Sequence, residues 1–147
     1  MTKTIKLITV LFASILIFGT SCGKYEDGPG LSLRSKKARM ANTWKIVEAT
    51  DADDDVTTGY AGTTWTFTKE GDYTKGGETA AGTVVEEKGK WEFGKLDGEE
   101  KKQLIISTDG VVIPKKWEIT RLTNDELWLK KEQALGTFET RKLEGQD

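Results

Sequence analysis

Residues 115–132 read KKWEITRLTNDELWLKKE, and their pattern decides the fold class that we predict for the chain. Trp117 and Ile119 alternate with polar residues before Thr123-Asn124-Asp125, and Leu127 and Leu129 share one parity after it. A period of two is that of a β-strand with one buried face, and threonine, asparagine and aspartate favour turns. The stretch therefore predicts a hairpin of two strands, 115–122 and 125–132.

The same pattern recurs along the chain after residue 43. Four of the five tryptophans lie in tripeptides that put two large apolar side chains on one face, namely Trp44-Lys45-Ile46, Trp65-Thr66-Phe67, Trp91-Glu92-Phe93 and Trp117-Glu118-Ile119. With the turn residues between them, they predict strands at 43–50, 62–69, 71–77, 82–87, 89–94, 102–109, 115–122, 125–132 and 136–143. We expect an all-β fold, either a small antiparallel up-and-down barrel of about 8–9 strands or a sandwich, and closure of a barrel would remove exposed edges.

Several of these motifs resemble the lipocalin-like domain of lipoproteins from Gram-negative bacteria. The resemblance rests on Trp44 after a short helix, the hairpin FTKEGDY at 67–73, Gly89-Lys90-Trp91, and the run ITRLTNDEL at 119–127. It covers roughly residues 40–143 and implies a small antiparallel β-barrel. Its motifs are strand cores and turns, so it carries no catalytic residue over and leaves the function open.

The first 22 residues, MTKTIKLITVLFASILIFGTSC, predict a lipoprotein signal peptide over 1–21. Lys3 and Lys6 precede an apolar run from Leu7 to Phe18, and small residues then lead to Cys22. The run is well short of the roughly 20 residues that span a bilayer as a helix. The resemblance to lipoprotein signals implies cleavage before Cys22 and a palmitate-type lipid on it, which would anchor the chain in the membrane. An uncleaved anchor or a buried helix is the alternative.

Residues 22–31 are turn-rich and predict a lipid anchor followed by a flexible tether. Within them Lys24, Glu26 and Asp27 resemble the export signal of lipoproteins that reach the outer face of the outer membrane; an ordinary acidic linker on the periplasmic face is the alternative. Residues 32–42 predict a short basic helix that begins after Ser32. It would brace one end of the domain formed by 43–147, or contact anionic lipid headgroups.

Composition excludes several classes of function. The chain has no histidine and a single cysteine, so one copy cannot form a disulfide, a Cys/His zinc site or a histidine-dependent triad. Removing Lys3 and Lys6 leaves 20 basic and 24 acidic residues, a formal charge of −4, which makes nucleic acid a poor partner. We therefore predict a protein that is not an enzyme and needs no cofactor.

Two acidic patterns have ordinary explanations. The segment Asp51-Ala52-Asp53-Asp54-Asp55 begins like a calcium loop, but Val56 and Gly62 stand where such a loop needs glycine and glutamate, so we predict a solvated loop and no metal site. Glu86-Glu87 and Glu99-Glu100 resemble the carboxylate pair of a glycosidase. Neighbours along a strand point to opposite faces, however, and both pairs fit a solvated hairpin.

Two hypotheses about function remain, and an enzyme is kept only as a reserve. The first is a binding module whose barrel holds a small apolar ligand in a cavity lined by Trp44, Trp65, Phe67, Tyr73, Trp91, Phe93, Trp117 and Phe138. The second is a structural or interaction protein of the cell envelope, in which these aromatic residues form a solid core. In that case Trp128, whose parity is opposite to that of Leu127 and Leu129, or the basic helix would contact a partner protein.

Overall fold

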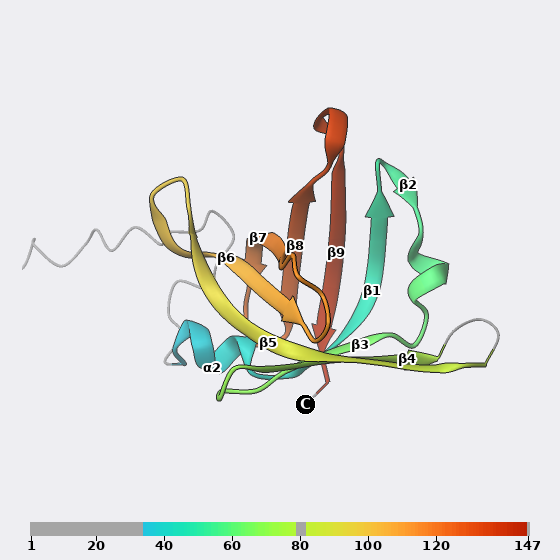
Figure 1. The fold of residues 1–147 in the computed structure, drawn as a ribbon, viewed down its shortest axis with the longest axis horizontal. Coiled ribbons are helices and arrows are strands. Elements are labelled where there is room, and N and C mark those ends of the chain that lie inside the picture. Colours follow the sequence, from blue (N-terminus) through green and yellow to red (C-terminus); the bar gives the residue numbers. More distant parts are fainter. Residues whose placement is uncertain (1–33, 79–81, 147) are drawn as a thin grey trace, which may run out of the picture.

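The structure is a computed structural model that describes residues 34–78 and 82–146 (Figure 1). Its described part holds one short α-helix and two 3-10 helices: α2 (Lys36–Met40), η1 (Thr57–Tyr60) and η2 (Ala134–Gly136). The remaining elements are strands: β1 (Thr43–Asp51), β2 (Asp54–Asp55), β3 (Thr64–Phe67), β4 (Asp72–Glu78), β5 (Val84–Leu96), β6 (Glu99–Thr108), β7 (Lys115–Leu122), β8 (Glu126–Glu132) and β9 (Phe138–Gly145).

The strands form a closed antiparallel barrel. From β3 to β9 each strand pairs with the next along the chain, and β1 pairs with β3 on one side and β9 on the other. The β1–β9 ladder runs from Trp44 opposite Gly145 to Asp51 opposite Glu139. Closure therefore uses eight strands, and β2 is an additional short strand that pairs with the end of β1. The predicted all-β, up-and-down barrel is confirmed.

One predicted break between strands is wrong, and several other strand ends differ from the prediction by one to three residues. Residues 82–87 and 89–94 were expected as two strands separated at Lys88, but β5 runs unbroken from Val84 to Leu96. Gly89 stays inside the ladder because it pairs with both Tyr73 and Thr108. A Cβ at this position would lie 2.0 Å from the carbonyl oxygen of Ser107, so the glycine allows a close approach of two strands rather than a turn.

Helix α2 begins later than the pattern predicted. Ser35, not Ser32, lies at its N-terminus, and the Ser35 side chain accepts a hydrogen bond from the amide of Ala38 at 3.1 Å. Residues 32 and 33 lie outside the described residues, as do the predicted signal peptide 1–21 and the anchor and tether 22–31, with Cys22, Lys24, Glu26 and Asp27. No helix within 34–78 and 82–146 is long and apolar enough to cross a membrane.

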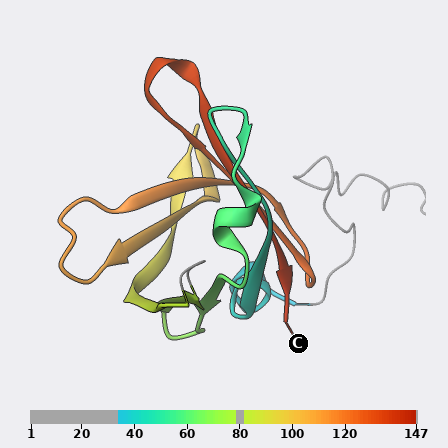
Figure 2. The same ribbon diagram turned by 90° about the vertical axis from the view of Figure 1, so that its right-hand side faces the viewer.

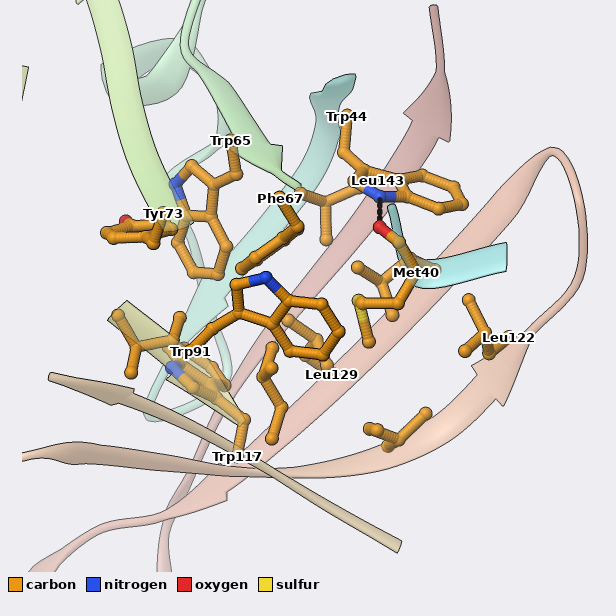
Figure 3. Close-up of a cluster of buried hydrophobic side chains, with 14 of the residues drawn as sticks. Met40, Trp44, Trp65, Phe67, Tyr73, Trp91, Trp117, Leu122, Leu129 and Leu143 are labelled. Carbon is orange, nitrogen blue, oxygen red and sulfur yellow. Dashed lines mark hydrogen bonds between the residues drawn. The ribbon is translucent and has the colours of Figure 1, made fainter. Parts of the chain in front are cut away.

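Helix α2 covers one end of the barrel. Its last residue, Met40, is fully buried, and the Trp44 indole donates a hydrogen bond to the Met40 carbonyl at 3.0 Å (Figure 3). Arg39 donates to the carbonyl of Leu122 at 3.0 Å and ties the helix to the end of β7. Apolar side chains from the strands pack against Met40, so this end of the barrel interior is filled.

Candidate functional site

The aromatic residues predicted to line a cavity occupy three different positions. Six of them lie in the buried core: Trp44, Trp65, Phe67, Tyr73, Trp91 and Trp117 (Figure 3). All of these except Trp44 pack edge to face or tilted against one another. Phe93 is half-buried beside Trp91, with ring centroids 5.2 Å apart. Phe138 is half-buried and lies under the ammonium of Lys130 at 3.6 Å. A ligand-lining role for the eight residues stays a prediction.

Polar side chains replace this apolar packing at the end of the barrel away from α2. Inward-facing positions alternate along each strand, so every second residue beyond the buried aromatic and leucine side chains also faces the interior. These positions, together with η1, bring charged and hydroxyl groups together in a region that we call the throat. It consists of Tyr60, Lys75, Glu87, Thr108, Lys115, Lys131, Glu139 and Arg141.

One half of the throat is organised around Arg141. Its side chain is only 2% exposed, and its guanidinium donates hydrogen bonds to the Thr50 carbonyl at 2.9 Å and the Tyr60 hydroxyl at 2.7 Å. Glu139 accepts from Arg141 and also pairs with Lys131. A buried cation is stable only when its donors find acceptors, so these contacts keep Arg141 inside the barrel.

The other half is organised around Glu87. Its carboxylate accepts from the Thr108 hydroxyl at 2.8 Å and from Lys115 at 3.2 Å. Burial by itself would raise the pKa of Glu87, but these two hydrogen bonds and the charges of Lys115 and Lys75 outweigh it and hold the pKa below its usual value. Tyr73 lies deeper; its burial, and secondarily the charge of Glu87, raises the pKa of its hydroxyl far above the usual value.

A pocket of about 170 Å³ lies beside Lys75 at the mouth of the throat. It is lined by residues of η1, β4 and β5 and by the residue before β3: Gly59, Tyr60, Thr63, Lys75, Gly76, Gly77, Glu78 and Val85. Lys75 forms no ion pair with any residue in the described part of the chain. Glu78, the acidic residue of the lining, has outward parity on β4 and is exposed. The lining therefore holds one cation and one acidic residue, and no ion pair joins Lys75 to Glu78.

Two indole groups below the throat lack hydrogen-bond acceptors. The Nε1 atoms of Trp65 and Trp117 are buried and have no partner among the described residues, and the two rings touch at a centroid distance of 5.8 Å. In Figure 3 both nitrogens lie on the side of the cluster away from Met40. Trp65 is also the cross-strand neighbour of Lys75. The two tryptophans thus lie at the inner end of the throat, and their indole N–H groups point away from the filled end.

The loops around the throat carry exposed apolar side chains. Val84 and Val85 begin β5, Val111, Val112 and Ile113 form the β6–β7 loop, and Leu135 lies in the β8–β9 connection. Val112 is 96% exposed and Leu135 is fully exposed. Figure 2 shows η1 in front of the barrel and the β6–β7 loop reaching out to one side. We call these six residues the apolar rim, and such exposure is uncommon unless a partner or ligand uses it.

A second pocket, of about 270 Å³, lies mainly against outward-facing residues of β6 to β9. Its lining consists of Leu96, Gln103, Lys116, Glu118, Lys130, Lys131, Glu132 and Phe138. Several of its charges are already compensated, since Glu118 pairs with Lys102 at 3.6 Å and Lys130 lies over Phe138. This surface has no buried unpartnered donor comparable with those of the throat, so the throat is the stronger candidate site.

Trp128 lies on the outer face, as its parity predicted, but it is half-buried. The side chains of Arg121 and Lys142 lie over its ring at 5.0 and 5.2 Å from the centroid. These contacts cover part of the aromatic surface. The interface role predicted for Trp128 stays a prediction.

The acidic segments have local structural roles. Asp51 accepts a hydrogen bond from Gln133, and Asp55 accepts from the amide of Thr57 at the start of η1. Within residues 34–78 and 82–146 no group of three histidine, cysteine, aspartate or glutamate residues is placed to hold a metal ion. Glu86 and Glu87 point to opposite faces of β5, and only Glu87 enters the throat.

Sequence reasoning missed the throat, although its signal was present. Lys75, Lys115 and Lys131 each lie two residues from a buried side chain of the same strand, namely Tyr73, Trp117 and Leu129. Arg141 likewise precedes Leu143 by two positions. Strict alternation would have placed all four cations inside the barrel, but we expected charged residues to face the solvent.

Comparisons with known proteins show a fold and no family. No protein-family model matches the chain. No curated protein matches it in sequence. Among solved structures, a lipocalin-like protein from Bacteroides uniformis matches with a TM-score of 0.54 and 12% identity, covering 74% of this chain and 99% of that one. An uncharacterized protein from Bacteroides eggerthii matches with a TM-score of 0.53 and 10% identity, covering 73% and 99%. The chain therefore has a lipocalin-like barrel fold.

Proposed function

We propose that this chain is a lipid-anchored lipoprotein of the outer membrane that binds a small, largely apolar ligand through the throat of its barrel. The observation that carries the proposal is the pocket beside Lys75, because its lining includes Val85 of the apolar rim and Lys75, the cross-strand neighbour of Trp65. Concave sites with apolar walls and a few convergent polar groups are typical of small-molecule binding. The lipocalin-like fold supports this interpretation, since barrels of eight strands can hold one small ligand.

The membrane attachment in this proposal rests on the signal pattern that ends at Cys22. The lipid would hold the N-terminal tether at the membrane, on the cell surface if Lys24, Glu26 and Asp27 act as an export signal and on the periplasmic face otherwise. Helix α2 begins a few residues after the tether and covers the filled end of the barrel. The throat at the other end would then be accessible to ligands in solution.

Binding without catalysis fits the chemistry of the throat. Both of its carboxylates are held by cations, Glu87 by Lys115 and Glu139 by Lys131 and Arg141. For Glu87 the hydrogen bonds of Thr108 and Lys115 hold the pKa below its usual value, which keeps this carboxylate ionised and weakens it as a proton acceptor. The raised pKa of Tyr73 likewise makes its hydroxyl a poor nucleophile at neutral pH. These groups can orient a ligand. Among the described residues of the throat, no base lies beside a nucleophile.

Native mass spectrometry of the lipoprotein purified from its own cells tests the proposal. We expect a fraction of the protein to carry a small molecule that is lost on denaturation. The matched control is a variant with Val85→Trp, which puts a bulky side chain into the pocket lining and should lower the bound fraction. A single mass equal to that of the lipidated chain alone, in both proteins, would contradict ligand binding.

An interaction role is the second candidate, and the apolar rim favours it. Val112 and Ile113 project from the β6–β7 loop and lie outside the pocket lining, so a small ligand in the pocket leaves them exposed. A partner protein of the envelope would bury them. A pull-down with the intact lipoprotein should then retain a specific partner that the double variant Val112→Ser and Ile113→Ser loses; recovery of none would count against this role.

A further inference from the structure

We propose that the ligand of the throat is a small amphipathic acid, whose anionic group lies next to Lys75 and the Trp65 indole and whose apolar part lies against the rim. The inference rests on the proposed function and adds the chemical class and the orientation of the ligand. It depends on three features at this end of the barrel: indole donors without acceptors, a cation that forms no ion pair in the described residues, and exposed apolar side chains.

The unpartnered indole donors are exceptional within this core. Trp44 donates to the Met40 carbonyl at 3.0 Å, and Trp91 donates to the Thr68 carbonyl at 2.9 Å. Trp65 and Trp117, which are only 5% and 2% exposed, have no acceptor in the described residues. A buried donor left unpaired costs about 1–3 kcal/mol, so native proteins rarely keep one without a partner. A ligand that supplies an acceptor would remove this cost for at least one of them.

Because Lys75 is a cation, we expect the acceptor group of the ligand to be an anion. Its backbone pairs directly with that of Trp65, so both side chains lie on the same face of neighbouring strands. Glu87, its partner on the other side, is already engaged by Thr108 and Lys115. The ammonium therefore forms no ion pair among the described residues, although Glu78 belongs to the same lining. An anion held by an ammonium and an N–H donor forms charge-assisted hydrogen bonds, which are stronger than neutral ones.

The apolar rim indicates that the other half of the ligand is apolar. Val85 belongs to both the pocket lining and the rim, so an apolar group that leaves the pocket passes over it directly. The pocket volume of about 170 Å³ is below the usual range for drug-sized ligands and accommodates a head group with a short segment of chain. A molecule with an acidic head and an apolar tail satisfies both surfaces, and its head lies inward.

Isothermal titration calorimetry with three probes of equal chain length tests this orientation. Octanoate, octanol and octylamine are titrated at pH 7.5 into the full chain in nanodiscs, with empty nanodiscs as the blank. We expect octanoate to bind about tenfold or more tightly than either other probe, which corresponds to one charge-assisted hydrogen bond. Lys75→Met should abolish most of this preference, and Trp65→Phe should reduce it.

Lys45→Met is the matched control, because Lys45 is exposed on the outer face of β1, and it should leave the preference for octanoate unchanged. Lys75→Gln repeats the test if Lys75→Met does not fold. Equal affinity for octanoate and octanol would overturn the acidic head while leaving the proposed function intact. Failure of all three probes would overturn the amphipathic class, and native mass spectrometry of the cellular protein then decides separately whether any ligand binds.

Discussion

Replacing Glu139 by glutamine tests whether the throat is stabilised by its buried ion pairs. Glu139 has a side chain that is 13% exposed, and it faces both Arg141, which is 2% exposed, and Lys131, which is 31% exposed. Removing one partner of a buried pair leaves an uncompensated charge and typically costs 3–5 kcal/mol. Because Lys131 keeps access to solvent and Arg141 keeps its bonds to Thr50 and Tyr60, we expect the lower end, about 3 kcal/mol.

Urea unfolding followed by tryptophan fluorescence measures this loss as a fall in the free energy of unfolding. Two control variants calibrate it. Tyr60→Phe removes a single hydrogen bond to Arg141 and should cost about 1 kcal/mol. Glu126→Gln removes a pair with Arg121 on the barrel exterior and should cost less than about 1 kcal/mol. A cost for Glu139→Gln no larger than that of Glu126→Gln would refute the reasoning.

Three further predictions concern other parts of the chain. Gly89→Ala should prevent folding or lower the thermal midpoint strongly, because its Cβ would meet the Ser107 carbonyl at 2.0 Å, whereas Gly59→Ala, with open space around it, should unfold within a few degrees of the wild type by circular dichroism. Burial, then the charges of Arg39 and Lys101, lower the pKa of Lys36 from 10.5 to about 8 in the folded state. The folded state therefore binds this proton less tightly than the unfolded chain does, and the penalty disappears as pH rises from about 8 to 10.5. The free energy of unfolding of the wild type, measured relative to Lys36→Met, should rise over that window, and a flat difference would contradict it. Cys22→Ser should release the protein from cell membranes without unfolding it; full recovery in the membrane pellet would contradict lipid anchoring.

The barrel was predictable because its signal is local and repeated. The tripeptides that begin with Trp44 and Trp117 placed buried faces correctly, and strand 115–122 has the boundaries that alternation predicted. The break predicted at Lys88 was wrong, since a glycine such as Gly89 fits the start of a strand as well as a close approach of two strands. Only the neighbouring strand, which brings the Ser107 carbonyl against it, distinguishes the two cases.

The site was less predictable, because it depends on which charged residues the barrel encloses. Lys75 and Arg141 look like surface residues in a sequence that is rich in charge, and their inward parity has meaning only once the sheet is closed. For Trp65 and Trp117, burial was expected from the pattern. The lack of acceptors for their indole N–H groups follows from side-chain packing, which no periodicity encodes.

The most direct test of the account is the response of the Trp65 indole N–H to octanoate. In a ¹⁵N-labelled protein the indole signals are separate from the amide signals, and Trp65→Phe identifies the one in question. A donor that gains a carboxylate acceptor shifts its proton resonance downfield, so we predict a saturable downfield shift for Trp65 with octanoate, a small one with octanol, and none for Trp44, whose donor is already bound to Met40. No shift of the Trp65 signal at saturating octanoate, or equal shifts at Trp65 and Trp44, would contradict the proposed site.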